Sequence, residues 1–143
     1  MPDTPETIIA FDFGLRRIGV AVGQQVTNSS NTLETLANVE SGPDWLRIDE
    51  IIREWGPQRL IVGMPLHTDG SPSKTSERVS SFVAELDRFE LPIETVDERY
   101  SSVEAQAVLK SKRARGLRGR ISKESIDSTA AKLIAERWLK NER

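Results

Sequence analysis

Acidic residues that could act together in one reaction occur at three widely separated points of this chain. Asp12 interrupts an apolar run between two phenylalanines, Asp97 and Glu98 end another apolar run, and Asp127 lies in a stretch with helical periodicity. Carboxylates directed into one crevice repel each other unless a divalent cation lies among them. Oxygen-only ligands favour Mg²⁺ or Mn²⁺ over zinc. One or two such ions are suited to phosphodiester hydrolysis, because they activate water and stabilise a leaving oxygen.

Each acid also has a simpler interpretation when it is considered alone. Asp12 could leave the sheet and cap a turn, and Asp127 could be a residue of a helix start that pairs with a basic group. An ionised carboxylate inside an apolar run is nevertheless costly without hydrogen bonds, a positive partner or a metal. The three acids together therefore favour the metal-site hypothesis.

The segment from Ile8 to Gly23 must position the first of these acids. Two short runs rich in β-branched and aromatic residues flank Gly14-Leu15-Arg16-Arg17, a pattern typical of a tight β-hairpin. The first run is apolar on both faces, which predicts a strand that is covered on both sides. Asp12 would then lie near the end of a buried strand.

The rest of the chain predicts strands that alternate with helices. We expect an edge-like strand over residues 32–37, followed by a helix that starts at the Gly42-Pro43-Asp44 signal and ends at Gly56-Pro57. Apolar runs predict strands over 60–63 and 92–97, and helical periodicity predicts a helix between them. A capping pattern at Ser101 opens a further helix, a loop is expected over 113–120, and a last helix over about 122–140.

The simplest fold for this order is a five-stranded mixed sheet, an antiparallel meander extended by parallel strands, with helices on both faces. Ligands in such sheets bind beyond the carboxyl ends of the parallel strands, so Asp12 and Asp97-Glu98 would meet at one edge. In the last helix, Ala131 and Ile134 follow Asp127 by four and seven residues. This spacing predicts that Asp127 lies on or beside the face that meets the sheet.

Length and composition favour one domain, residues 1–143 with 1–6 as a tail, because 143 residues suffice for a single core. No stretch approaches the length of a membrane span, and we expect no membrane partner. The absence of cysteine excludes disulfides and zinc–thiolate sites, and a cytoplasmic location fits best.

A basic segment stands out against a net charge of −2. No acid occurs between Glu104 and Glu124, whereas seven Lys and Arg residues fall in that interval. We expect a loop that contacts phosphates, although a solvated helix end would have the same composition. The helix start at Ser73-Lys74-Thr75-Ser76 could also hold a phosphate, although a plain N-cap with a solvated lysine would have the same sequence. The candidate nucleic-acid-binding residues are Arg16, Arg17, Lys74, Arg99, Arg113, Arg115, Arg118 and Arg120.

Four motifs in order resemble the YqgF family of bacteria. They are Phe11-Asp12-Phe13-Gly14 with Arg17 to Gly23, Val62 to Leu66 with Asp69-Gly70-Ser71, Asp97-Glu98-Arg99, and Asp127 to Ala131. The resemblance covers about residues 7 to 139. Members are described as pre-16S rRNA nucleases or Holliday-junction-resolvase homologues with a ribonuclease-H-like fold. The resemblance implies that Asp12, Glu98 and Asp127 are the catalytic acids and metal ligands, for Mg²⁺ or Mn²⁺.

The resemblance also implies a substrate, the 5′ end of pre-16S ribosomal RNA, and a candidate partner, the precursor of the small ribosomal subunit. Three alternatives stay open: cleavage of branched DNA, a non-catalytic nucleic-acid-binding module, and an ATP-binding domain of the actin and sugar-kinase type. The last is disfavoured, because it needs two such domains and this chain has length for one. Symmetric resolution of a four-way junction would require a dimer, and no segment of the sequence marks a dimer interface.

Overall fold

The computed structural model describes residues 5–40, 42–64, 74–97 and 123–141. Side chains at positions 74, 75, 97, 123–128 and 141 lie outside the described part. The predicted helix from Ser101 and the predicted loop over 113–120 therefore fall outside the described residues.

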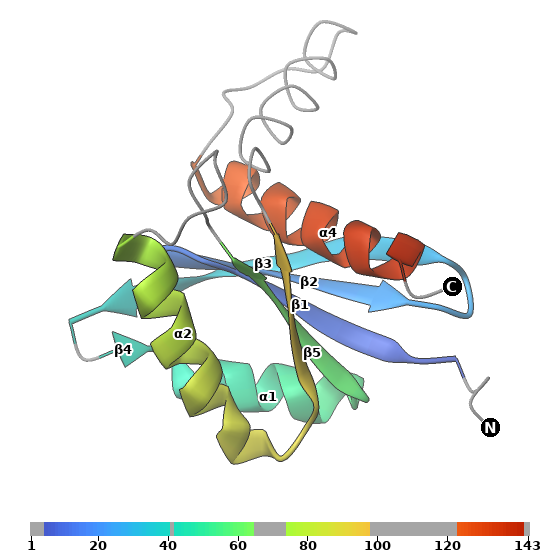
Figure 1. Ribbon diagram of the computed structural model, residues 1–143, viewed down its shortest axis with the longest axis horizontal. Coiled ribbons are helices and arrows are strands. Elements are labelled where there is room, and N and C mark those ends of the chain that lie inside the picture. Colours follow the sequence, from blue (N-terminus) through green and yellow to red (C-terminus); the bar gives the residue numbers. More distant parts are fainter. Residues whose placement is uncertain (1–4, 41, 65–73, 98–122, 142–143) are drawn as a thin grey trace, which may run out of the picture.

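A mixed sheet forms the centre of the molecule (Figure 1). Its strands lie in the order β4-β3-β2-β1-β5-β6; the pairs from β4 to β1 are antiparallel, whereas β1-β5 and β5-β6 are parallel. This confirms the meander extended by parallel strands. The strands are β1 (Thr7–Phe13), β2 (Arg17–Gln24), β3 (Ser29–Val39), β4 (Gly42–Pro43), β5 (Arg59–Met64) and β6 (Ile93–Asp97).

The sheet has six strands where the sequence predicted five. The additional strand, β4, is only two residues long and pairs with Asn38 and Val39 at the end of β3. A two-residue strand has no periodicity, so sequence patterns cannot reveal it. Strand β3 is also longer than the predicted residues 32–37, because residues 29–31 pair with β2 and residues 38–39 pair with β4. Only these last two residues are covered by β4, so the rest of β3 lies at the edge of the sheet in the described part of the chain.

Helices cover both faces of the sheet, as predicted. Figure 1 shows α1 and α2 on one face and α4 on the other. No helix in the described part of the chain is long and apolar enough to span a membrane. The helices are α1 (Trp45–Trp55), α2 (Lys74–Leu86, followed by a 3₁₀ turn at Asp87–Phe89) and α4 (Lys123–Asn141).

Strand β1 is buried from both sides, and its alternate residues belong to two different cores. Ile9 and Phe11 pack beneath α1 and α2, whereas Ile8 and Ala10 pack beneath α4. All four side chains are fully buried, which confirms the prediction of a strand covered on both sides. Because side chains alternate along a strand, Asp12 lies on the α4 face.

Helix α1 begins and ends at the residues that its sequence indicated. A carboxylate oxygen of Asp44 accepts a hydrogen bond from the Arg47 N–H at 3.2 Å, which caps the first turn. Gly56 ends the helix with φ 54°, a left-handed conformation that glycine adopts without strain. Trp55 follows Ile48, Ile51 and Ile52 at helical spacing, which is typical of a core residue, but it is 36% exposed at the end of the helix.

Aromatic contacts fix α2 against the sheet. The Phe82 ring lies 5.5 Å from Phe11, 4.9 Å from Phe13 and 5.6 Å from Trp45, measured between ring centres. Each such pair contributes about 0.5–1.5 kcal/mol to stability beyond the contribution from burying its apolar surface. The position of α2 is therefore tied to the carboxyl half of β1.

Helix α4 approaches the opposite face closely because its contact stripe contains small residues. Ala130, Ala131 and Ala135 are fully buried against the sheet, together with Ile134 and Trp138. The small side chains of Ala130 and Ala131 leave room for this approach. Leu133, on the same helix, is only partly buried.

Polar contacts fix the far end of α4. The Trp138 Nε1–H donates to Glu94 of β6 at 3.3 Å, and the Arg59 guanidinium lies 5.9 Å from the centre of the Trp138 ring. Arg59 also pairs with Glu94 and, at 3.0 Å, with Glu6. Its hydrogen bond to Glu6 raises the pKa of Arg59, which favours the charged guanidinium.

Candidate active site

Asp12 is the second-to-last residue of β1 and lies within the paired part of the strand. It is paired with Gly19 of β2 and is partly buried, whereas its neighbours Phe11 and Phe13 point to the opposite face. Gly19 has no side chain that could extend toward Asp12 from the paired strand. A partly buried carboxylate at the end of a strand suits a group that binds a ligand.

The turn that follows Asp12 is held from two sides. The Gly14 N–H donates to the Arg17 carbonyl at 2.8 Å. Asn38 of β3 donates from its side chain to the Gly14 carbonyl at 2.7 Å and from its backbone to the Arg16 carbonyl at 2.9 Å. A Cβ at Gly14 would lie 2.6 Å from the Arg17 carbonyl oxygen, so only glycine fits this turn.

The carboxyl ends of the parallel strands meet at one edge, here called the carboxyl edge and defined by the ends of β1, β5 and β6. Phe11 pairs with Val62, and Met64 pairs with Asp97, which brings these ends into line. Figure 1 shows that α4 begins above this edge and runs back over the sheet. Val96 of β6 packs on the α4 face. Glu98 follows β6 directly in the sequence but lies outside the described residues.

Asp127 lies in the first turns of α4, three and four residues before the buried Ala130 and Ala131. Its side chain lies outside the described part, so Asp12 is the one predicted acid whose side chain is described. Among the side chains that are described, no group of three or more acids or histidines is placed to hold a metal ion. That search covers neither Glu98 nor the Asp127 carboxylate.

Two predicted cations flank the turn and belong to different faces. Arg17 is the first residue of β2 and lies two residues before Gly19, hence on the α4 face and diagonal to Asp12. Arg16 lies in the exposed turn. Lys74 is the first residue of α2, with its side chain outside the described part. The remaining candidates lie outside the described residues: Arg99, Arg113, Arg115, Arg118 and Arg120.

A pocket on the other face of the sheet was not predicted. Its volume is about 560 Å³, and it lies between α2 and the paired ends of β3 and β4, beside the turn that follows β1. The lining residues come from three separate segments, within 13–16, 38–43 and 78–85. Each segment by itself has the pattern of a turn or an amphipathic helix. The exposure of the apolar residues Leu15 and Val39 at its rim is seen only in the structure, so the sequence offered no signal for this pocket.

Comparison with known proteins identifies close relatives of the whole chain. A family model described as RuvX, Holliday junction resolvase, matches residues 6–141. A protein of Nitrosococcus oceani is 45% identical over 96% of this chain and 89% of its own length. A protein of Azotobacter vinelandii is 40% identical over 94% of each chain. Both carry the name "Putative pre-16S rRNA nuclease".

Solved structures support the fold. RuvC of Thermus thermophilus, in complex with a Holliday junction substrate, aligns with a TM-score of 0.56 at 13% identity, over 95% of this chain and 94% of that one. The yeast mitochondrial Holliday junction resolvase Ydc2 also aligns with a TM-score of 0.56, at 12% identity, over 93% of this chain and 77% of its own. Identities this low show only a shared fold, which confirms the ribonuclease-H-like class. The family model over residues 6–141 and the relatives at 40–45% identity show that the chain belongs to the RuvX/YqgF family.

Proposed function

We propose that this protein is a metal-dependent nuclease that hydrolyses phosphodiester bonds during 5′-end maturation of pre-16S ribosomal RNA. The observation that carries the proposal is the position of Asp12: a partly buried carboxylate at the carboxyl edge, on the face where α4 begins. The relatives at 40–45% identity support RNA as the substrate. Such an enzyme would act in the cytoplasm on a precursor of the small ribosomal subunit.

The acids of this site would be Asp12, Glu98 and Asp127. Glu98 directly follows β6, and Asp127 belongs to the helix that covers the Asp12 face. Three carboxylates form an oxygen-only donor set, which fits Mg²⁺ or Mn²⁺. When bound, such an ion would supply an activated water and stabilise the leaving oxygen.

Basic residues of the protein would hold the nucleic-acid strand in place at these acids. Arg17 is diagonal to Asp12 on the same face, which suits a guanidinium that orients the phosphate next to the acids. Lys74 at the start of α2, where backbone N–H groups are free of helical partners, would add a second phosphate contact. Arg99 and the four arginines of the basic segment would bind the backbone further along: Arg113, Arg115, Arg118 and Arg120.

Branched DNA is the second candidate substrate. The description of the family as a Holliday junction resolvase and the fold shared with Thermus thermophilus RuvC favour it. A symmetric resolvase cuts two strands and needs two active sites. We therefore expect such an activity only from a dimer.

The deciding experiment offers the purified protein two substrates in parallel, a 5′-extended pre-rRNA fragment and a four-way DNA junction. With Mg²⁺ or Mn²⁺ we expect cleavage of the RNA at a defined position, and with EDTA no cleavage. Cleavage of the junction alone would support the DNA substrate instead. Metal-independent binding without cleavage of either substrate would overturn the nuclease proposal and favour a non-catalytic module.

A further inference from the structure

The pocket between α2 and the β3–β4 pair lies next to the proposed active site, although it opens on the other face. Phe13, which lies in its floor, directly follows Asp12 in β1, and neighbouring strand residues point to opposite faces. Consecutive Cα atoms are only about 3.8 Å apart. A nucleic-acid strand that crosses the carboxyl edge at Asp12 would therefore pass the mouth of this pocket.

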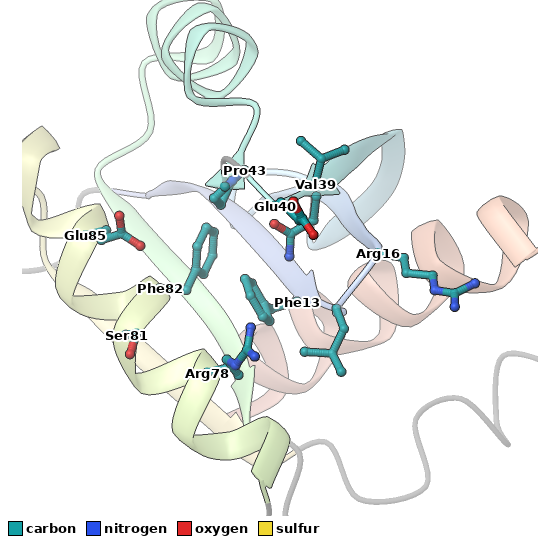
Figure 2. A pocket seen from close by; sticks show the side chains of 12 residues that line it. Phe13, Arg16, Val39, Glu40, Pro43, Arg78, Ser81, Phe82 and Glu85 are labelled. Atoms are coloured by element: carbon teal, nitrogen blue, oxygen red, sulfur yellow. The ribbon is translucent and has the colours of Figure 1, made fainter.

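Figure 2 shows how the walls are built. Arg78, Ser81, Phe82 and Glu85 come from α2, Val39, Glu40 and Pro43 form the opposite wall, and Phe13 lies between them. The volume of about 560 Å³ falls within the range of pockets that bind small molecules, roughly 300–1,000 Å³.

Apolar surface is left exposed at the rim of this pocket. Leu15 is 57% exposed and Val39 is 60% exposed, although both are large apolar side chains. Beneath them, the rings of Phe13 and Phe82 form a nearly buried floor. Exposed apolar groups gathered around a cavity indicate a ligand with a flat apolar face.

The cations of the pocket have no partner in the described part of the chain. Of the described arginines, Arg16 and Arg78 are the two whose side chains have no hydrogen bond, ion pair or ring contact, and both line this pocket. Both side chains line the pocket, and Figure 2 shows the Arg16 side chain extending outward from it. Guanidinium groups in these positions suit a phosphate at the rim.

Carboxylates inside the pocket determine which part of a nucleotide it can take. Glu40 and Glu85 line the walls and would repel a phosphate, so the phosphate must stay outside with the arginines. Both carboxylates accept hydrogen bonds and cannot donate when ionised, which matches the exocyclic amino groups of bases.

We propose that this pocket binds an unpaired nucleobase of the strand whose neighbouring phosphate lies at Asp12. The inference rests on the proposed nuclease function and adds a requirement: the substrate must be single-stranded, or locally unpaired, close to the cleaved bond. Recognition of a base that has left its stack depends on an apolar surface and on hydrogen bonds to its edge, and this pocket offers both.

The test measures binding in EDTA, so that no cleavage is needed. Two strands of equal length and charge are compared, a mixed-sequence oligoribonucleotide and a fully abasic strand. Ser81→Leu narrows the pocket, and Ser80→Leu is its matched control, because both serines are exposed on α2 and both bond a carbonyl four residues earlier. Only Ser81 lines the pocket.

We expect Ser81→Leu to weaken binding of the oligoribonucleotide at least about 5-fold and to leave the abasic strand unchanged. Ser80→Leu should match wild type for both strands. Arg78→Ala should weaken both strands, because the phosphates remain in the abasic one, whereas Arg53→Ala on α1 should weaken neither. Wild-type binding by Ser81→Leu, or an equal loss for both strands, would overturn the base pocket. If wild type cleaves RNA, the nuclease proposal holds whether or not the Ser81→Leu binding data support the base pocket.

Discussion

At the scale of single residues, the chemistry depends on where a charge is tolerated. Asp12 interrupts the run of buried apolar residues from Ile8 to Phe13, and this departure from the apolar pattern made it recognisable in the sequence. Its pairing with Gly19 and the diagonal position of Arg17 depend on strand register, which a single sequence does not specify. A sequence can therefore reveal the acid but not its neighbours.

The first prediction concerns the three acids. Asp12→Asn, Glu98→Gln and Asp127→Asn should each lower the single-turnover cleavage rate at least about 100-fold, the lower end of what one group at a reacting centre contributes. Each variant should keep the circular dichroism spectrum and, in EDTA, at least the Tm of wild type, because fewer charges then repel one another. Asp49→Asn on α1 is the control and should cleave normally. An acid whose variant keeps near wild-type turnover is wrongly assigned.

The second prediction concerns the turn after Asp12. Gly14→Ala should destabilise the protein by about 1–3 kcal/mol, because its Cβ would meet the Arg17 carbonyl oxygen at 2.6 Å and the backbone must shift. Urea unfolding measures the loss. Gly42→Ala is the contrast, because its cost would come from the backbone angle alone: φ is 111° at Gly42, and no atom lies within 4 Å of its Cβ position. Equal cleavage rates for Gly14→Ala and wild type would show that the turn does not position Asp12.

At the scale of elements, helices and long strands could be predicted because their patterns extend over many residues. The end of α1 at Gly56-Pro57 and the last helix, Lys123–Asn141, match the predictions within a few residues. The two-residue β4 could not be predicted, and neither could the exposure of Trp55, because both depend on tertiary contacts. The pocket is a product of such contacts, since its walls come from three segments.

The third prediction concerns the anchor at the far end of α4. Arg59→Ala removes ion pairs to Glu6 and Glu94 and the contact with the Trp138 ring, and should cost about 1–2 kcal/mol in urea unfolding. Arg59→Lys should recover only part of this, because an ammonium cannot bond both carboxylates in the same geometry. Arg53→Ala removes an exposed pair with Asp49 and should cost below about 0.5 kcal/mol. A full rescue by lysine would show that only the charge of Arg59 matters.

At the scale of the whole molecule, the sheet separates the proposed catalytic residues from the proposed base-binding pocket. The α4 face carries Asp12 and the start of the helix that contains Asp127, whereas the α1–α2 face carries the aromatic core and the pocket. The carboxyl edge is the line where the two faces meet. A polyanionic strand laid along this edge would contact both, so affinity and cleavage can be altered separately.

The last prediction uses this separation. Replacing Arg113, Arg115, Arg118 and Arg120 by alanine should weaken RNA and DNA binding alike, because phosphate contacts carry no sequence information. Each lost contact with a single strand should also reduce the slope of log affinity against log salt concentration by about 0.7. Turnover at saturating substrate should fall much less than affinity, since the three acids are unchanged. Filter binding from low to high salt measures the slopes for wild type and the quadruple variant. Superimposable slopes would show that these four arginines release no counterions on binding, and that the basic segment is only a solvated helix end.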